Sequence, residues 1–213
     1  MKYKAYLFDF DGTLVDSMPS YGSVMKRILD EYGISYGSDL VKIITPLGAR
    51  GTARYYRELG LDMPEEEIMA LMGKYLYDEY AYRIPAKPGV IETLHRLKSF
   101  GADLNILTAS PHAVLDVCLA RLGITDLFTN IWSCDDFATS KADPEIYKRA
   151  AEIIGAPIGD VLFLDDNLNA NKTGREAGIA LCAVYDSSSE DYMEEIKSVA
   201  DYYIYDFSEI LSL

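Results

Sequence analysis

A short apolar run near the amino terminus ends abruptly in acidic residues, and this junction constrains the fold more than any other stretch. Residues 5–8 have the pattern of a buried strand, and Asp9 and Asp11 follow at once. Charged carboxylates are rarely buried in a core strand, so the two acids must lie at the strand's carboxyl end. In an open α/β sheet that end faces the ligand crevice, which predicts that both acids project into a site.

The same turn carries groups suited to a cation and to an anion. Two carboxylates two residues apart repel each other and need a counter-cation, and Mg²⁺ prefers such oxygen ligands. Gly12 permits a tight turn and is expected to expose its backbone N–H to an anion, while Thr13 is expected to satisfy a hydrogen bond of the turn. We therefore predict a magnesium site here and interpret Asp9 as a nucleophile.

Charge and cysteine content limit the classes of partner. The chain has 213 residues and a formal net charge of −14, which disfavours nucleic acids and anionic membranes as partners. Three cysteines lie in apolar stretches without C-x-x-C spacing, so we expect reduced core residues in a cytoplasmic protein. No amino-terminal signal and no apolar run of membrane length is visible. Nothing in the sequence demands an assembly, and we expect a monomer.

The hydrophobic period divides the chain into an alternating part and a helical insert. Residues 17–85 show helical spacing without a clear strand, and prolines and a glycine at 84–89 indicate a hinge. The remainder alternates strands and helices, which predicts an α/β fold with a doubly wound, mostly parallel sheet. The expected core domain is 1–16 with 86–213, and the small inserted helical domain is 17–85. Core strands are expected at 5–8, 102–107, 128–134, 159–164, 179–185 and 202–205, and insert helices near 18–32, 39–44, 52–59 and 64–82.

Polar residues also follow two later runs that we expect to be core strands. Thr108 ends the second run just before an expected helix, so its hydroxyl and the N–H groups leading into that helix offer an anion site. Asp165 and Asp166 end the fourth run. Because these strand ends and the first one face the same crevice, we expect the acids to complete the magnesium site with Asp9.

Two basic residues are candidates for contact with an anionic substrate. Lys141 lies just before a helix, a position that normally attracts acids, so we expect it to point into the crevice. Arg50 lies in the expected loop 48–52, bracketed by glycines, where it could grip a carboxylate or a second phosphate; the alternative is a solvated arginine at a helix start. His95 and His112 lack partners at metal-ligand spacing, and we interpret both as structural.

The string Asp9-Phe-Asp-Gly-Thr-Leu-Val-Asp-Ser17 resembles the first motif of the haloacid dehalogenase superfamily, which comprises Asp-dependent phosphatases and phosphotransferases. The resemblance extends over the chain and is strongest to the phosphoglycolate phosphatase and beta-phosphoglucomutase-like branch. Thr108, Lys141 and the pair Asp165-Asp166 match the second, third and fourth motifs. Ala142 replaces the first proline of the third motif, and Ala170 stands where a later acid is common, so outer support of the metal must come from Asn167, Asn169 or Asn171.

The resemblance implies a role for each matched residue. Asp9 would attack phosphorus to form an aspartyl-phosphate, and Asp11 would act as general acid and base. Asp166 would bind Mg²⁺ directly and Asp165 would support it. The remaining implied contacts to the metal, phosphoryl group or substrate are Asp9 and Asp11 as further metal ligands, Thr108, Ala109, Gly12 and Lys141 at the phosphoryl group, and Arg50 and Tyr21 from the inserted cap.

The function predicted from these residues is a Mg²⁺-dependent phosphatase acting on a small phosphorylated metabolite. A phosphosugar mutase is the alternative, but such relatives commonly carry Ser-x-Ser-Lys at the second motif and a histidine after the first. This chain has Thr108-Ala-Ser-Pro111 and Tyr21 there. A hydrolytic dehalogenase lacks the second acid of the first motif, so Asp11 disfavours it. A non-catalytic binding module would be expected to have lost an acid or Lys141.

Overall fold

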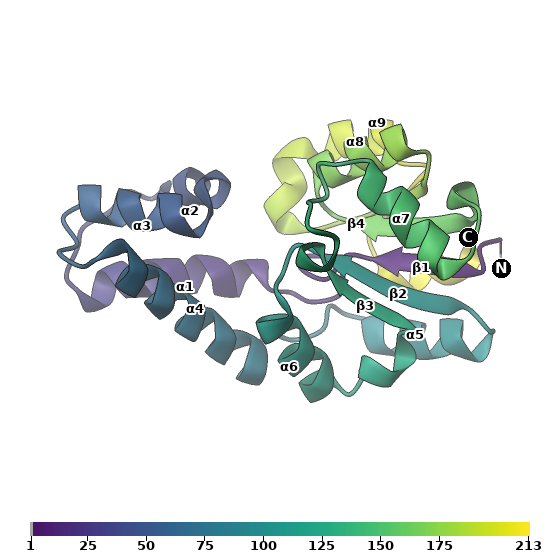
Figure 1. Ribbon diagram of the computed structural model, residues 1–213, viewed down its shortest axis with the longest axis horizontal. Coiled ribbons are helices and arrows are strands. Elements are labelled where there is room, and N and C mark those ends of the chain that lie inside the picture. The colour runs from purple at the N-terminus through teal and green to yellow at the C-terminus, as the bar shows by residue number, and fades with distance from the viewer. Residues whose placement is uncertain (1) are drawn as a thin grey trace. The chain divides into compact units, whose positions relative to one another are not determined.

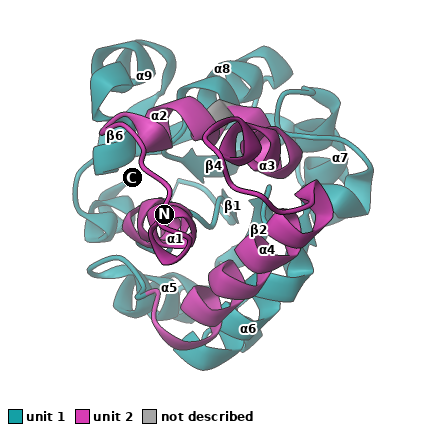
Figure 2. Cartoon of the chain, turned by 90° about the vertical axis from the view of Figure 1, so that its left-hand side faces the viewer, with its two compact units in different colours: residues 1–16, 85–213 teal, residues 17–84 magenta. Residues whose placement is uncertain are grey.

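A computed structural model describes residues 2–213, apart from the side chain of Pro46. The chain divides into two compact units, Met1–Asp16 with Pro85–Leu213 and Ser17–Ile84, which Figure 2 colours separately. Each unit has a hydrophobic core of its own. No helix in the described part of the chain combines the length and the apolar character needed to cross a bilayer.

The larger unit is built on one six-stranded sheet in the order β3-β2-β1-β4-β5-β6. All neighbouring strands pair in parallel, which confirms the predicted α/β fold. The strands are β1 (Ala5–Phe8), β2 (Asp103–Thr108), β3 (Asn130–Ser133), β4 (Val161–Asp165), β5 (Ala180–Val184) and β6 (Tyr202–Ile204). Their bounds differ by a few residues from the expected ones, because turns of 3-10 helix take up the flanks of some apolar runs, as at Ile158–Asp160 before β4.

Helices cover both faces of this sheet. They are α5 (Val90–Ser99), α6 (His112–Leu122), α7 (Glu145–Ile154), α8 (Leu168–Ala177) and α9 (Met193–Val199). Figure 1 shows α5 and α6 on one face and α7, α8 and α9 on the other. Right-handed crossovers require this arrangement, because the chain moves outward from β1 to β3 and then returns to build β4 to β6 on the opposite side. The three cysteines, Cys118, Cys134 and Cys182, are free and buried, as the sequence predicted.

The strand order reverses at β1, which lies between β2 and β4. Phe8 pairs with Leu164 across the two strands, and the backbone N–H of Asp9 donates to the Leu164 carbonyl at 2.8 Å. This register brings Asp9 beside Asp165 at the carboxyl ends of two adjacent strands. In sheets of this type such a reversal point is where ligands bind.

The chain leaves and re-enters the larger unit through two segments that are hydrogen-bonded to each other. Val15 and Ala86 form an isolated antiparallel bridge. On either side of it, the Asp16 N–H donates to the Pro85 carbonyl and the Lys87 N–H donates to the Leu14 carbonyl, each at 3.0 Å. The core side of the expected hinge is therefore an ordered pair of strand-like segments.

The smaller unit contains, among its described residues, four α-helices and a turn of 3-10 helix at Thr45–Leu47. The α-helices are α1 (Met18–Glu31), α2 (Leu40–Ile44), α3 (Gly48–Glu58) and α4 (Glu65–Tyr82). Tyr56 is fully buried in its core and donates a hydrogen bond to the Met25 carbonyl at 2.8 Å. The expected loop 48–52 is wrong, because α3 begins at Gly48 and includes these residues. Ala49 and Arg50 are good helix formers, and Gly48 and Gly51 lie in the first turn of the helix. The helix therefore begins before residue 52, where the glycines had led us to expect its start.

Candidate active site

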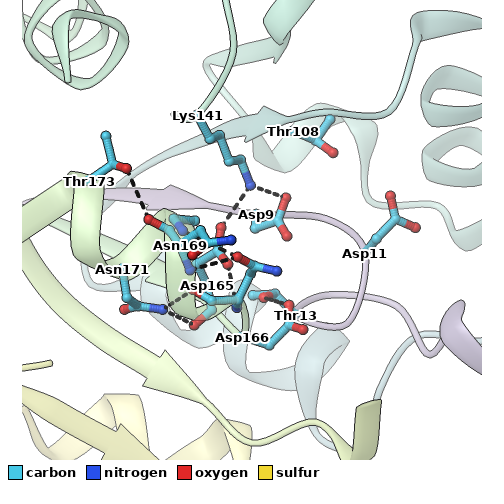
Figure 3. A network of polar contacts seen from close by, with 12 residues as sticks. Asp9, Asp11, Thr13, Thr108, Lys141, Asp165, Asp166, Asn169, Asn171 and Thr173 are labelled. Atoms are coloured by element: carbon cyan, nitrogen blue, oxygen red, sulfur yellow. Dashed lines mark hydrogen bonds and ion pairs between the residues drawn. The ribbon is translucent and has the colours of Figure 1, made fainter. Parts of the chain in front are cut away.

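Lys141 contacts two of the predicted acids at the carboxyl edge of the sheet. Its Nζ lies against Asp9 Oδ1 and donates to Asp165 Oδ2 at 2.8 Å, as Figure 3 shows. The lysine comes from the loop before α7, and its side chain is only 13% exposed. An ammonium group so enclosed keeps its charge only because both carboxylates face it.

Three acids form a buried cluster around this lysine. Oxygen atoms of Asp9, Asp165 and Asp166 all lie within 4.8 Å of one another. Asp166 Oδ1 accepts a hydrogen bond from the Thr13 hydroxyl, and its Oδ2 accepts one from the Ser189 hydroxyl, each at 3.2 Å. Three ionised carboxylates beside one ammonium leave an excess of negative charge, and every donor atom is an oxygen. This donor set fits a hard divalent cation such as Mg²⁺.

Burial and the excess of negative charge shift the pKa values of residues in the cluster. Burial raises the pKa of Asp9 to about 7, against the opposing effect of Lys141 and with a further increase from the charges of Asp165 and Asp11. Burial, with the charges of Asp165 and Asp9, raises the pKa of Asp166 well above its ordinary value. Burial lowers the pKa of Lys141, but the two carboxylates beside it outweigh burial, so the net shift is upward. Without a bound cation Asp9 and Asp166 therefore tend to hold protons while Lys141 stays charged.

Asp11 lies apart from the cluster of described acids. Figure 3 shows its side chain pointing away from Asp9, and its Oδ2 accepts a hydrogen bond from the Ser110 hydroxyl at 2.5 Å. The expected set of four metal-binding carboxylates is thus divided, with three together and the fourth half-buried beside the end of β2. Both roles expected of Asp11, in proton transfer and as a metal ligand, remain predictions.

Thr108 and Ala109 lie at the end of β2, the strand next to β1. Thr108 is buried, and its Oγ1 accepts a hydrogen bond from the Ser110 N–H at 3.0 Å. A hydroxyl that accepts one hydrogen bond still has its own proton to donate, so Thr108 can bind an anionic oxygen. Ala109 is exposed directly after the strand.

Gly12 does not offer its N–H to an anion as expected, because that group donates to the Val15 carbonyl at 2.9 Å and closes the turn. The glycine has φ +74°, and a Cβ placed on it would lie 2.7 Å from the Cγ and both carboxylate oxygens of Asp166. Residues with a side chain rarely adopt this backbone conformation. The glycine is therefore required by the turn and by the close approach of Asp166.

The two candidate residues of the smaller unit have local partners. Arg50 lies in the first turn of α3, and its Nη1 is 3.6 Å from Glu65 Oε2 and 3.5 Å from Glu66 Oε1. The arginine is 57% exposed, so these ion pairs are weak and leave it accessible. Tyr21 in α1 packs half-buried against the core of this unit, and burial raises the pKa of its hydroxyl. A substrate role for either residue stays a prediction.

Support for the acids comes partly from residues that sequence reasoning missed. Of the three expected asparagines, Asn167 donates its backbone N–H to Asp165 Oδ1 at 2.7 Å, and Asn171 donates its side-chain amide to the Asp165 carbonyl at 3.1 Å. Ser110 and Ser189 were not anticipated. Ser189 belongs to a run of serines that follows β5. Polar residues after the carboxyl end of a core strand are the sequence signal that could have identified it as a site residue. His112 lies between Asp116 and Asp136, at 3.0 and 2.8 Å, which fits its predicted structural role.

Comparisons with known proteins identify relatives over most of the chain. The family model for haloacid dehalogenase-like hydrolases matches residues 3–178. The phosphoglycolate phosphatase of Rhodobacter capsulatus is 26% identical, over 97% of this chain and 94% of its own. The N-acetylmuramic acid 6-phosphate phosphatase of Pseudomonas aeruginosa is 30% identical, over 86% of this chain and 82% of its own. The crystal structure of a beta-phosphoglucomutase candidate from Thermotoga maritima superposes with a TM-score of 0.83 at 25% identity, covering 98% of this chain and 97% of its own. The chain belongs to the haloacid dehalogenase-like hydrolase family.

Proposed function

We propose that the protein is a Mg²⁺-dependent phosphatase that hydrolyses a phosphate monoester of a small metabolite. The observation that carries this proposal is the buried Asp9 carboxylate at the end of β1, held against Lys141 and clustered with Asp165 and Asp166. A carboxylate fixed in this way can serve as a nucleophile. The two curated relatives described above are named as phosphatases of small phosphorylated compounds, which supports the same reaction class.

The reaction would proceed in two displacements. In the first, an oxygen of Asp9 bonds to phosphorus while the ester P–O bond breaks, and Asp11 donates a proton to the departing alcohol oxygen. In the second, Asp11 removes a proton from water, whose oxygen attacks phosphorus and releases inorganic phosphate and the Asp9 carboxylate. Splitting one difficult displacement in two lowers the barrier of each, and acid–base transfer contributes about 10²–10⁴-fold.

The other residues of the site would bind the charged groups. Asp9 and Asp166 would hold Mg²⁺, with Asp165 as a supporting acid that also fixes Lys141. When bound, the ion would offset the negative charge of the carboxylates and of the phosphoryl oxygens. Lys141 and the Thr108 hydroxyl would stabilise those oxygens, as positioned charges and donors do in phosphoryl transfer.

We assign residues 17–84 as the cap that selects the substrate and excludes bulk water during the reaction. Arg50 is a cap residue suited to an anionic group of the substrate, because it is accessible and its present partners hold it weakly. Tyr21 would contribute an apolar ring and a hydroxyl. These are proposals about specificity and do not affect the chemistry assigned to the larger unit.

Hydrolysis of p-nitrophenyl phosphate in the presence of Mg²⁺ tests the reaction class. Asp9→Asn keeps the size of the side chain and removes the nucleophile, so we expect kcat to fall by at least about a thousandfold. A variant that retained a tenth of the parent rate would refute the assignment of Asp9. A panel of phosphorylated metabolites that includes 2-phosphoglycolate and N-acetylmuramic acid 6-phosphate would then identify the preferred substrate.

Incubation with β-glucose 1-phosphate separates the phosphatase from a phosphosugar mutase. The likeness to a beta-phosphoglucomutase candidate makes this control necessary. A phosphatase releases inorganic phosphate and glucose, whereas a mutase yields glucose 6-phosphate without a net release of phosphate. We expect inorganic phosphate or no reaction.

A further inference from the structure

Lys87 is a second enclosed lysine of the larger unit, and the reaction described above does not use it. Its side chain is 16% exposed, and its Nζ donates to the Gly12 carbonyl at 2.6 Å, to the Tyr185 carbonyl at 2.6 Å and to Asp186 Oδ2 at 3.0 Å. An ammonium group has three donors, and all three are used here. The side chain is therefore held in one position by groups from two distant segments of the chain.

The first of these segments leads to Asp166 through Thr13. The Gly12 carbonyl that Lys87 holds belongs to the peptide bond joining Gly12 to Thr13. The Thr13 hydroxyl donates to Asp166 Oδ1 at 3.2 Å, a contact visible in Figure 3. Fixing the Gly12 carbonyl thus fixes the plane of the peptide from which the Thr13 side chain extends.

The second segment leads to the other oxygen of the same carboxylate. Asp186 is buried, and its Oδ1 accepts hydrogen bonds from the Ser188 N–H at 2.9 Å and the Ser188 hydroxyl at 2.6 Å. The Ser189 N–H donates to the Asp186 carbonyl at 3.1 Å, and the Ser189 hydroxyl donates to Asp166 Oδ2 at 3.2 Å. Asp186 therefore shapes the turn that presents the Ser189 hydroxyl.

We infer that Lys87 is a positioning residue for the proposed metal ligand Asp166: by holding the Gly12 carbonyl and the Asp186 carboxylate, it fixes the two hydroxyls that orient the Asp166 side chain. In the described part of the chain, the hydrogen-bond partners of the Lys87 ammonium are the Gly12 and Tyr185 carbonyls and the Asp186 carboxylate, and none of these groups belongs to Asp166 or takes part in the proposed reaction. The inference rests on the proposed function, because it assigns Lys87 an effect on the affinity for Mg²⁺. Removal of a residue that orients a metal ligand commonly weakens metal binding by about 10–100-fold.

Calorimetric titration of the full-length protein with Mg²⁺ tests the inference directly. Lys87→Met removes the ammonium and keeps a long side chain, and we expect the dissociation constant for Mg²⁺ to rise by about tenfold or more. Asp186→Asn retains a side chain of the same size but replaces one accepting oxygen with an NH2 donor, which must face either Lys87 or the two Ser188 donors, so we expect the dissociation constant to rise in this variant as well. This second variant supplies the result if Lys87→Met does not fold.

Arg175→Met is the matched control. Arg175 also joins a carbonyl and a carboxylate, with Nε 2.9 Å from the Val199 carbonyl and Nη2 2.7 Å from Asp201 Oδ1, but it lies at the amino-terminal edge of the sheet. We expect this variant to lose stability and to bind Mg²⁺ like the parent. Ser189→Ala provides the link: in that background Lys87→Met should weaken Mg²⁺ binding by a smaller factor, because one of the two routes is already absent.

The outcomes separate this inference from the function on which it rests. If the parent binds Mg²⁺ and Asp166→Asn abolishes binding, the site is established. In that case, if Lys87→Met folds and binds Mg²⁺ as tightly as the parent, only the positioning role of Lys87 is overturned. If Lys87→Met does not fold, unchanged Mg²⁺ affinity of Asp186→Asn leads to the same conclusion. If the parent binds no Mg²⁺, both the proposed function and the role of Lys87 are overturned.

Discussion

Gly12→Ala tests whether the close approach of the turn to Asp166 sets the geometry of the site. The substitution has two separable costs. An alanine at φ +74° adopts a left-handed conformation, which costs about 1–2 kcal/mol. The added Cβ would also lie 2.7 Å from all three atoms of the Asp166 carboxyl group, well inside van der Waals contact, so this side chain or the turn must move.

Gly123→Ala isolates the first of these costs. Gly123 ends α6 with φ +70°, almost the same conformation, and a Cβ there would meet no atom within 4 Å. We expect urea unfolding to show a loss of about 1–2 kcal/mol for Gly123→Ala and a larger loss for Gly12→Ala. Only Gly12→Ala should impair the reaction, because a displacement of about 1 Å at a reacting site can cost about a hundredfold in rate.

The assay compares kcat/KM for p-nitrophenyl phosphate with the affinity for Mg²⁺ in both variants. We expect Gly123→Ala to match the parent in both. Gly12→Ala should lose about a hundredfold in kcat/KM and bind Mg²⁺ more weakly. If the two alanine variants retained equal activity, the contact between the turn and Asp166 would have no functional importance and the reasoning would be wrong.

Three further predictions concern ionisation and proton transfer. Asp11→Asn should lower kcat by about 10²–10⁴-fold because it removes the proposed general acid and base, and a variant with the parent kcat would contradict that role. Calorimetry of the same variant tests the predicted role of this carboxylate as a metal ligand, which unchanged Mg²⁺ affinity would overturn. In metal-free protein the pKa of Asp9 is about 7, above its value in the unfolded chain. The free energy of unfolding should therefore fall as pH rises from about 4 to 7, by up to about 1.4 kcal/mol per pH unit. Urea unfolding of Asp9→Asn should show a smaller fall over the same pH range. The protonated His112 ring donates hydrogen bonds to Asp116 and Asp136, and these bonds raise the pKa of His112. The stability that they add to the folded protein is therefore present below about pH 6.5 and disappears as pH rises through the pKa of the folded state. His112→Gln should therefore cost less than about 1 kcal/mol at pH 6 and nothing at pH 9, and a cost that grew with pH would contradict this.

The sequence was sufficient for the sheet and for the cluster of acids because both depend on strong local signals. Apolar runs that end in Asp9 and in Asp165 admit few positions other than the carboxyl ends of parallel strands. Asp166 is the residue after Asp165, so the same apolar run also predicts its position at this strand end. Lys141 could be placed from its anomalous charge at a helix start, although the sequence does not show which carboxylates it contacts.

The remainder depends on side-chain and backbone directions that sequence patterns do not encode. The turn closes through the Gly12 N–H, which removes that group from anion binding, and it sends Asp11 away from Asp9. Ser189 meets Asp166 only because β5 lies next to β4, a fact of strand order. The start of α3 at Gly48 shows the weakness of glycine as a stop signal when good helix formers surround it.

The paired segments at Val15 and Ala86 have a consequence for how such a protein can diversify. Residues 17–84 begin and end at one hydrogen-bonded crossing, so an insert of any length can occupy this place without altering the register of a core strand. Under the proposed role of residues 17–84 as the cap, replacement of this whole unit would change the substrate range and leave the residues of the larger unit unaltered. Grafting another helical insert between Asp16 and Pro85 is the corresponding route for engineering.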